Sequence, residues 1–374
     1  MQEEYIPFLL RERDCKTMLK LEVPNWQTGR SSALLTGQWA WIFLLILCII
    51  FSFIGPGFFG FFNIQNIVTN MAFVLLLAMG QTFAIIAGGI DLSTGYVMGL
   101  ASVVSARVVL WASGFLPLPL AMLLAVLVGL LVGILPGLVN GVIIARLAMP
   151  PFIVTLGMYG IARGTSFLFA NGQPVSVPID GIGALGNNYL LYFPPGRGVS
   201  FFQPPTGLTH DQMRDMVQLL PFQLIITVVV VLICIWLLAR TRFGTHVYAI
   251  GGSREAARRS GIPVTRRTIQ IYVLSASLAT LAGLLYMFHY TSGTADAGDP
   301  LLIDSIAAVT IGGASLFGGE GSMIGTLVGA LIIAVLQNGL VIVGIDPFWQ
   351  FIAVGIVIIL AVLIDRAKAR ISGV

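Results

Sequence analysis

Charged residues are scarce in this chain. Lys, Arg, Asp and Glu together make up 10% of its 374 residues, whereas a typical soluble domain contains roughly 25%. Hydrophobic residues make up 57%, and the mean hydropathy is +0.94. A water-soluble fold has no way to bury that much apolar surface, which argues against a soluble enzyme, a disordered chain or a nucleic-acid-binding protein. The composition predicts a chain embedded in a lipid bilayer.

Residues suited to metal or redox chemistry are also few. The chain lacks a GxxxxGK[ST] loop, which ATP-binding proteins use to hold phosphates, and it lacks HExxH and GxSxG motifs. We therefore expect no catalytic residue, metal or cofactor in this chain. The cysteines form no CxxC pair, and the histidines lack the spacing of metal ligands: Cys15, Cys48, Cys234, His210, His246 and His289.

Long apolar runs are abundant, and they are continuous rather than alternating. An outer-membrane barrel would alternate apolar and polar residues with period two, so the runs predict an all-α polytopic membrane protein. Each helical crossing needs about 20 apolar residues, and the sequence accommodates about ten. We place them at residues 39–55, 66–87, 93–111, 119–141, 152–170, 219–239, 268–290, 303–316, 322–343 and 348–365.

The positions of Lys and Arg predict the orientation. Fifteen of the 20 lie in three clusters, before residue 39, between 240 and 267, and after 365. Basic clusters favour the cytoplasmic side, so both termini and the 240–267 loop are expected there. On this topology residues 1–38 form a cytoplasmic extension, 39–366 the membrane domain, 171–218 an external loop and 367–374 a cytoplasmic tail. The external loop is either a partner-binding surface or a passive insertion.

Glycine spacing suggests an internal repeat. Gly129, Gly133 and Gly137 recur every four residues, as do Gly325 and Gly329, and this spacing lets a neighbouring helix approach closely. Each run leads to an Asn-Gly pair at 140–141 or 338–339 and then to a Pro-Phe pair at 151–152 or 347–348. On the predicted topology the two Asn-Gly pairs fall on opposite sides of the membrane. This indicates an inverted repeat of spans 2–5 and 7–10, a common transporter architecture. The alternative is a chance match between glycine-rich helices.

The motif Gly88-Gly89-Ile90-Asp91-Leu92-Ser93 interrupts two apolar runs. A carboxylate near membrane depth needs a partner or a function. Either the motif is a break in the pathway, where Asp91 fixes a helix end or contacts a solute, or it is a turn at the cytoplasmic surface, in which Asp91 or Ser93 caps the next helix. Polar residues elsewhere in the spans suggest a pathway for a neutral, hydrogen-bonding solute. The predicted pathway residues are Gln81, Thr82, Asp91, Asn140, Thr155, Gln337 and Asn338.

The 240–267 loop encodes a short helix with both ends marked. Ser253 is a predicted N-cap, Glu255 suits the first turn and Gly261 suits the left-handed C′ position. A solvated basic loop would explain the arginines but not this paired capping around two alanines, which suggest a smooth docking face. We predict that the helix docks onto a partner protein through Ser253, Arg254, Glu255, Ala256, Ala257, Arg258, Arg259 and Gly261.

A family resemblance follows from these motifs. Glu255-Ala256-Ala257-x-x-x-Gly261 resembles the EAA-x3-G loop of ABC importer permeases. The sequence is more specifically similar to permeases of ribose- and xylose-type importers. The further stretches that carry this similarity are residues 88–93, 171–174, 306–309, 312–316 and 318–321. The resemblance spans about residues 66–366, and the chain departs from the family in its long 171–218 loop, its N-terminal extension and the absent LP ending of the wider motif.

The resemblance implies a type II-like importer fold in the bacterial inner membrane. It also implies three partners: a cytoplasmic ATP-binding cassette subunit that holds ATP and Mg²⁺, an external sugar-binding protein, and a second permease copy, identical or homologous. We predict that the ATPase subunit is the partner that docks on the helix at about 254–260 and couples ATP hydrolysis to transport. The competing hypotheses are an ion-coupled secondary transporter or channel, and an intramembrane enzyme. Ionisable residues deep in the spans are few, namely Asp91, Arg163 and His289, which favours the importer.

Overall fold

The structure of the chain is a computed structural model that describes residues 28–196, 198–209, 212, 216–346 and 348–371. The chain divides into two compact units, Met1–Trp39 and Ala40–Val374, and the contacts reported below lie within the second. Of the predicted N-terminal extension, residues 1–27 lie outside the described part, and so do residues 372–374 of the predicted tail. The described part of the extension is helical, since the first helix begins at Thr28.

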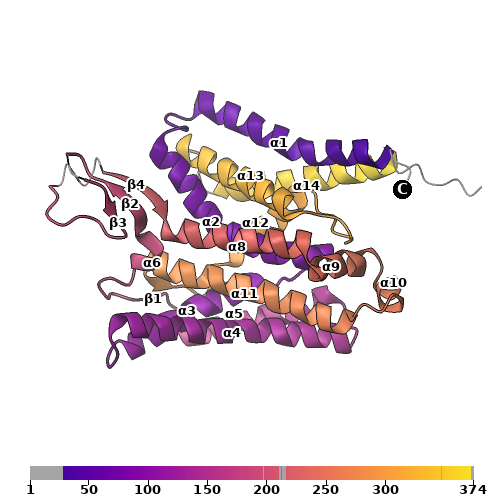
Figure 1. The fold of residues 1–374 in the computed structure, drawn as a ribbon, viewed down its shortest axis with the longest axis horizontal. Helices are drawn as coiled ribbons and strands as arrows, with labels where there is room; N and C mark the ends of the chain where they lie inside the picture. The colour runs from indigo at the N-terminus through magenta and orange to yellow at the C-terminus, as the bar shows by residue number, and fades with distance from the viewer. Residues whose placement is uncertain (1–27, 197, 210–211, 213–215, 347, 372–374) are drawn as a thin grey trace, which may run out of the picture. The chain divides into compact units, whose positions relative to one another are not determined.

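Within the described residues, a helix overlaps each of the ten predicted spans (Figure 1). The helices are α1 Thr28–Ile54, α2 Phe61–Ile86, α3 Thr94–Ala112, α4 Leu118–Arg146, α5 Pro151–Ala170, α8 Phe222–Arg240, α11 Val264–Tyr290, α12 Asp299–Ile311, α13 Met323–Ile342 and α14 Phe348–Ile371. Three shorter helices are α6 Ala184–Asn187, α9 Arg242–Gly252 and α10 Arg254–Arg259.

Seven of the described helices are long and apolar enough to cross a membrane, which makes this a multi-pass membrane protein. The apolar parts of α1 and α14 are shorter, at Trp39–Ile54 and Phe348–Leu360. The 13 residues of α12 span roughly 20 Å at 1.5 Å per residue, less than the hydrocarbon core of about 30 Å. The predicted bounds of this span, 303–316, also differ from those of the helix. The helix begins at Asp299 and ends before Gly312 and Gly313, and Gly313 has a φ of 87°.

The core forms where α11 packs against α2, α3 and α4. A Cβ at Gly133 would overlap Thr280 Oγ1, and one at Gly137 would lie 2.5 Å from Ala276 Cβ, so the glycines of α4 allow α11 to approach closely. Gly129 faces Ser105 and Leu284 in the same way. In α13, Gly325 faces the backbone of Gly312, and Gly329 faces that of Ala308 in α12. Both glycine runs therefore lie at tight helix contacts.

The prediction of an all-α fold is wrong for the 171–218 loop, because its aromatic stretch 189–193 pairs as a strand. Two small antiparallel sheets are present: β1 Val175–Ser176 with β5 Ser292–Gly293, and β3 Ser200–Phe201, β2 Tyr189–Phe193 and β4 Val217–Pro221 in that order. Because β4 continues to Pro221, α8 begins at Phe222 rather than at 219.

The two ends of the bundle differ. The β1–β5 pairing joins the ends of α5 and α11, and the sheet of β2, β3 and β4 lies at the end of the bundle opposite α9 and α10 (Figure 1). At the latter end the N–H of Gly319 donates to Ile86 O (2.8 Å), and Tyr248 Oη donates to Gly321 O (2.7 Å). The residues after α2 and α12 therefore meet the 240–267 loop, as the predicted alternation of the spans requires.

Candidate functional site

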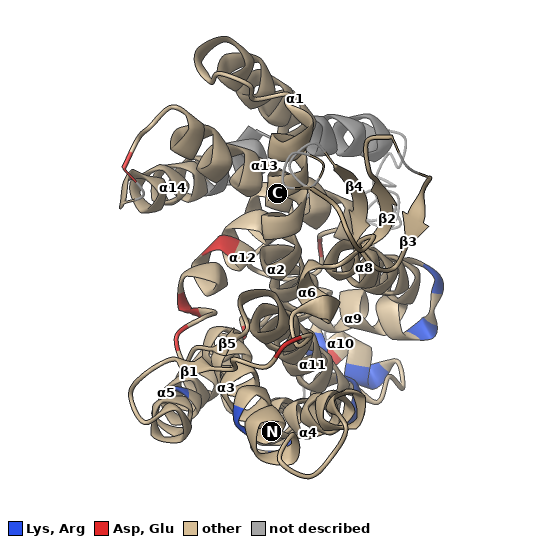
Figure 2. Cartoon of the chain, turned by 90° about the vertical axis from the view of Figure 1, so that its left-hand side faces the viewer, with Lys and Arg blue, Asp and Glu red and all other residues tan. Residues whose placement is uncertain are grey.

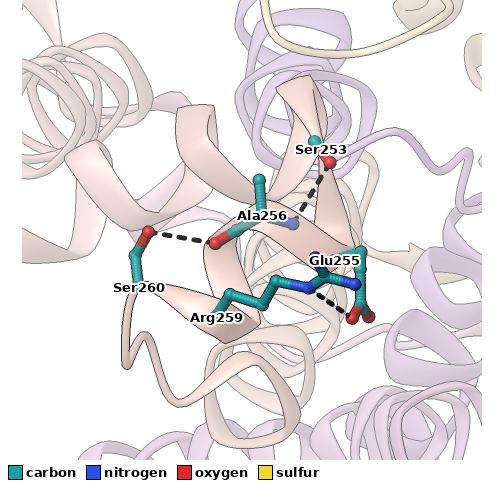
Figure 3. A network of polar contacts seen from close by, with 5 residues as sticks. All are labelled: Ser253, Glu255, Ala256, Arg259 and Ser260. Atoms are coloured by element: carbon teal, nitrogen blue, oxygen red, sulfur yellow. Dashed lines mark hydrogen bonds and ion pairs between the residues drawn. The ribbon is translucent and has the colours of Figure 1, made fainter. Parts of the chain in front are cut away.

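The helix predicted in the 240–267 loop is present as α10, with both caps. Ser253 Oγ accepts from the N–H of Ala256 at 3.2 Å (Figure 3). At the other end the N–H of Ile262 donates to Ala257 O, and that of Gly261 to Arg258 O, both at 3.1 Å. These two bonds and the positive φ of 81° at Gly261 form a Schellman motif. The local sequence thus defines a short rigid helix at the end of the bundle.

The surface of α10 is charged and exposed, with one exception. Arg259 Nε donates to Glu255 Oε1 at 3.0 Å, but the two side chains are 79% and 65% exposed. Solvated pairs of this kind contribute at most about 1 kcal/mol, so the pair does not fix the helix. The exception is Ala257, which is 4% exposed and packs against Ile250 and Val264.

The predicted docking face of two alanines is therefore wrong for Ala257. Ala256 is exposed, while Ala257 anchors α10 to its own protein. Neighbouring residues on a helix are about 100° apart around the axis, so both alanines cannot lie at the centre of one face. The remaining predicted coupling residues are exposed: Ser253, Arg254, Glu255, Ala256, Arg258, Arg259 and Gly261.

A basic groove lies beside α10. It has a volume of about 1120 Å³, and its walls come from the α4–α5 turn, from α10 and from the start of α11. Arg146, Arg254, Arg258 and Arg266 line it, with Glu255 as the acidic member. Basic residues gather around α9 and α10 in Figure 2. The groove and the exposed face of α10 together form a surface suited to a partner with acidic residues.

A second polar contact ties α9 to α11. Arg267 Nε donates to His246 Nδ1 at 2.9 Å, and Arg267 also donates to Gln270 Oε1 at 2.9 Å. Burial and the charges of Arg267 and Arg242 lower the pKa of His246. A neutral ring is what this bond requires, because a protonated His246 has no lone pair to accept it.

The predicted pathway residues do not form one site. Gln81, Asp91, Asn140 and Thr155 meet around the break between α2 and α3 and are fully buried. The amide of Gln81 bonds to the backbone of Asp91 in both directions, at 2.5 and 3.2 Å. Asn140 Nδ2 donates to Ser93 Oγ (3.0 Å), and Thr155 Oγ1 to Ile90 O (3.1 Å). Thr82 lies apart and bonds to Thr326 at 2.7 Å.

Asp91 itself holds the start of α3. Its Oδ1 accepts from the N–H and Oγ of Ser93, at 3.1 and 2.6 Å. The sequence offered Asp91 or Ser93 as the cap, and Asp91 is the one that bonds at this helix start, because the hydroxyl of Ser93 does not cap α3. With 0% exposure, Asp91 is closed to a solute in this conformation, and the capped-turn hypothesis fits the geometry.

Replacing Asp91 with Asn should leave assembly and transport near the wild-type level. The Oδ1 acceptor remains, and a neutral amide costs less to bury than a carboxylate. Within the described residues, Asp91 Oδ2 has no hydrogen-bond partner, so no donor is lost. Asp91→Ala removes the acceptor of both Ser93 bonds and should cost about 1–3 kcal/mol. Thermal stability and transport of the two purified variants test this. Complete loss of transport by folded Asp91→Asn would show that the charge itself acts in the pathway.

Gln337 and Asn338 lie instead on a cavity of about 650 Å³ between α2, α11, α12, α13 and α14. Gln337 Nε2 donates to the buried Asp304 Oδ2 at 2.8 Å. The sequence interpretation missed the other polar residues of this wall. Asn66 and Asn70, four residues apart and therefore on one face of α2, were the available signal. The missed wall residues are Asn66, Asn70, Tyr286, Tyr290 and Gln350.

Comparison with known proteins identifies the class as a transport permease. Residues 63–362 match the family described as "Branched-chain amino acid transport system / permease component". The chain is 39% identical over 327 residues to a ribose import permease protein of Bacillus subtilis, covering 87% of this chain and 91% of that protein. It is 37% identical over 339 residues to a fructose import permease protein of Rhizobium meliloti (88% and 85%).

A third relative is a xylose transport system permease protein of Haemophilus influenzae, 34% identical over 370 residues and covering 88% of this chain and 96% of that protein. No solved structure matches. The chain belongs to this permease family. Its relatives are named as transport permeases, in agreement with the predicted resemblance.

Proposed function

We propose that this chain is the membrane subunit of an ATP-driven importer that moves a neutral monosaccharide or related polyol across the bacterial inner membrane. The observation that carries the proposal is the likeness, over nearly the whole chain, to permeases named for ribose, fructose and xylose. The subunit works as a dimer, with ATP and Mg²⁺ bound by a separate cytoplasmic ATPase and sugar delivered by an external binding protein. Both termini and the 240–267 loop face the cytoplasm.

The side chains of the α2–α13 cavity support a neutral solute. Its wall combines the amides of Asn66, Asn70, Gln337, Asn338 and Gln350 with two tyrosines. Amides both donate and accept hydrogen bonds, which matches the hydroxyl groups of a sugar. The family description names branched-chain amino acids, so leucine is the competing solute to include in any transport assay.

The contacts of α10 support its role in energy coupling. Ala257 fixes the helix to Ile250 and Val264. A Cβ at Gly251, in α9, would overlap Ile86 O at the end of α2. Gly319, after α12, bonds to the same carbonyl oxygen. A force applied to α10 by the ATPase would therefore reach α2 and α12, which border the cavity.

The helix contacts also support the inverted repeat of spans 2–5 and 7–10. If α2, α3 and α4 correspond to α11, α12 and α13, then the packing of α11 on α3 and α4 should have a counterpart. It does, because α2 packs on α12 and α13. The glycine runs do not follow this correspondence, because the run of α4 faces α11, whereas the run of α13 faces α12, the counterpart of α3.

Sugar uptake by cells tests the proposed function against an ion-coupled transporter. A bacterial strain lacking its own ribose uptake would receive the genes for this chain, its neighbouring ATPase and the binding protein. We expect uptake of radiolabelled ribose only when all three are present, and no competition by leucine. Uptake that persists without the ATPase gene and stops with a proton uncoupler would contradict the proposal.

A further inference from the structure

Charged groups lie on the outer surface of the bundle at membrane depth. Arg163, in α5, is exposed and lies roughly 18 Å from Pro151 and 10 Å from Ala170 along the helix axis. Asp296 is exposed and Asp299 partly exposed in the stretch from β5 to α12. We call Tyr159, Arg163, Asp296 and Asp299 the Arg163 group.

The geometry joins Tyr159, Arg163 and Asp299 from distant parts of the sequence, and Asp296 lies three residues before Asp299 in the chain. Tyr159 Oη donates to Asp299 Oδ1 at 2.9 Å, and Tyr96 Oη to Asp299 Oδ2 at 3.3 Å. The two tyrosine rings form an edge-to-face pair 4.7 Å apart, and the guanidinium carbon of Arg163 lies 5.6 Å from the centre of the Tyr96 ring. Arg163 makes no ion pair or hydrogen bond with any residue that the structure describes. Its N–H donors are therefore available to a ligand.

Lipid is an unfavourable environment for this face. A charged side chain at the depth of the hydrocarbon core costs several kcal/mol unless it meets water or a partner. The outward face of α4 shows the contrast, because its most exposed residues are uniformly apolar: Leu123, Leu127, Leu131 and Leu135. The face of α5 that carries Arg163 therefore meets water or a partner rather than lipid, whereas the face of α4 suits lipid.

We propose that the Arg163 group lines the aqueous pathway and holds a neutral, polyhydroxylated solute by its hydroxyl groups. Arg163 supplies hydrogen-bond donors, Asp296 and Asp299 supply acceptors, and Tyr159 offers a ring edge beside them. Neighbouring hydroxyl groups of a solute both donate and accept hydrogen bonds, so they need donors and acceptors together. The group carries one positive and two negative charges, so it disfavours an anionic solute such as a sugar phosphate. The choice of a sugar rests on the proposed function, but the wetness of the face does not.

The cavity between α2 and α13 lies on the same side. Ala297, Pro300 and Leu301 belong to its wall, and they alternate along the chain with Asp296 and Asp299. In Figure 2, which looks along the helices, the stretch between β5 and α12 with its acidic residues lies between α14 and α5 along one side of the bundle. The short stretch 296–301 thus contributes residues both to the amide-lined cavity and to the Arg163 group.

Cysteine labelling tests whether the face is wet. Gly160 lies three residues before Arg163, and nothing lies within 4 Å of a Cβ placed there. Gly160→Cys and the control Leu131→Cys would be made in a chain whose three native cysteines are replaced. Leu131 is 66% exposed and lies in mid-helix. In proteoliposomes of the purified chain, a bilayer-impermeant cationic methanethiosulfonate should modify Gly160→Cys at least tenfold faster. Equal, slow reaction at both sites would overturn the proposal, because Arg163 would then extend along the lipid toward the surface.

Transport kinetics test the solute contact. In the complete complex with ribose as substrate, Arg163→Ala should raise the apparent KM at least tenfold, and Arg163→Lys should recover part of the loss. The matched control is Arg107→Ala in α3, whose Nε donates to Phe169 O; its KM should stay within about twofold of wild type. Unchanged KM in Arg163→Ala and Asp299→Asn would overturn the solute contact. If the complex moves no sugar, the proposed function fails, while the labelling ratio still decides whether this face is wet.

Discussion

Ala256→Trp should abolish both capture of the ATPase and ATP-driven transport without reducing the amount of folded permease. Ala256 is exposed on α10, and its neighbours Arg254, Glu255 and Arg258 line the basic groove. An indole on a rigid, doubly capped helix would keep a closely fitting partner away. Because most interface energy comes from a few central contacts, we expect at least a hundredfold loss of affinity. Pull-down of the ATPase at matched membrane levels measures it.

Two further variants separate docking from folding. Ala257→Trp should fail differently, since Ala257 is buried against Ile250 and Val264: the indole would detach α10 from the bundle and lower the thermal stability of the isolated permease. Arg259→Ala removes only an exposed ion pair and should change little. Wild-type recovery of the ATPase by Ala256→Trp would show that docking lies elsewhere on the cytoplasmic surface.

Gly133→Leu should strongly destabilise the membrane domain. A Cβ at this position already overlaps Thr280 Oγ1, so a leucine would push α4 away from α11 along the largest helix contact of the core. Overpacking usually costs about 1–3 kcal/mol and sometimes more. For a chain of this size we expect a fall in Tm on the order of 10 °C, or no recoverable monodisperse protein.

The matched control for Gly133→Leu is Gly355→Leu in α14, where nothing lies within 4 Å of an added Cβ. Size-exclusion profiles and thermal unfolding in detergent compare the two. Gly133→Leu with the elution volume and Tm of the wild type would show that the tight α4–α11 contact is not required for the fold.

Local features were predictable from sequence, because the residues that decide them are neighbours. The caps of α10 at Ser253 and Gly261 depend on hydrogen bonds within the helix ends. The glycine runs of α4 and α13 are likewise read from spacing alone. The predicted bounds of α12 were wrong because the helix ends at Gly312 and Gly313. These glycines lie inside an apolar stretch, so the sequence looks like a span that continues.

Features that depend on the fold were missed. Nothing in the spacing of Ala256 and Ala257 shows which of them faces the core, because that depends on the docking of α10 against Ile250 and Val264. Asp299 meets Tyr159 across 140 positions and Tyr96 across 203, so the sequence presents Arg163 only as an isolated charge. The strand 189–193 was hidden by the proline and glycine residues that surround it.

ATP-dependent sugar uptake in a defined system tests the central claim most directly. Proteoliposomes would hold this chain and its ATPase with ATP and Mg²⁺ inside, and ribose with the binding protein outside. We expect ribose to accumulate above its external concentration only with hydrolysable ATP, and not when Ala256→Trp replaces the wild type. Accumulation driven by an imposed proton or sodium gradient, with no ATPase present, would contradict the account.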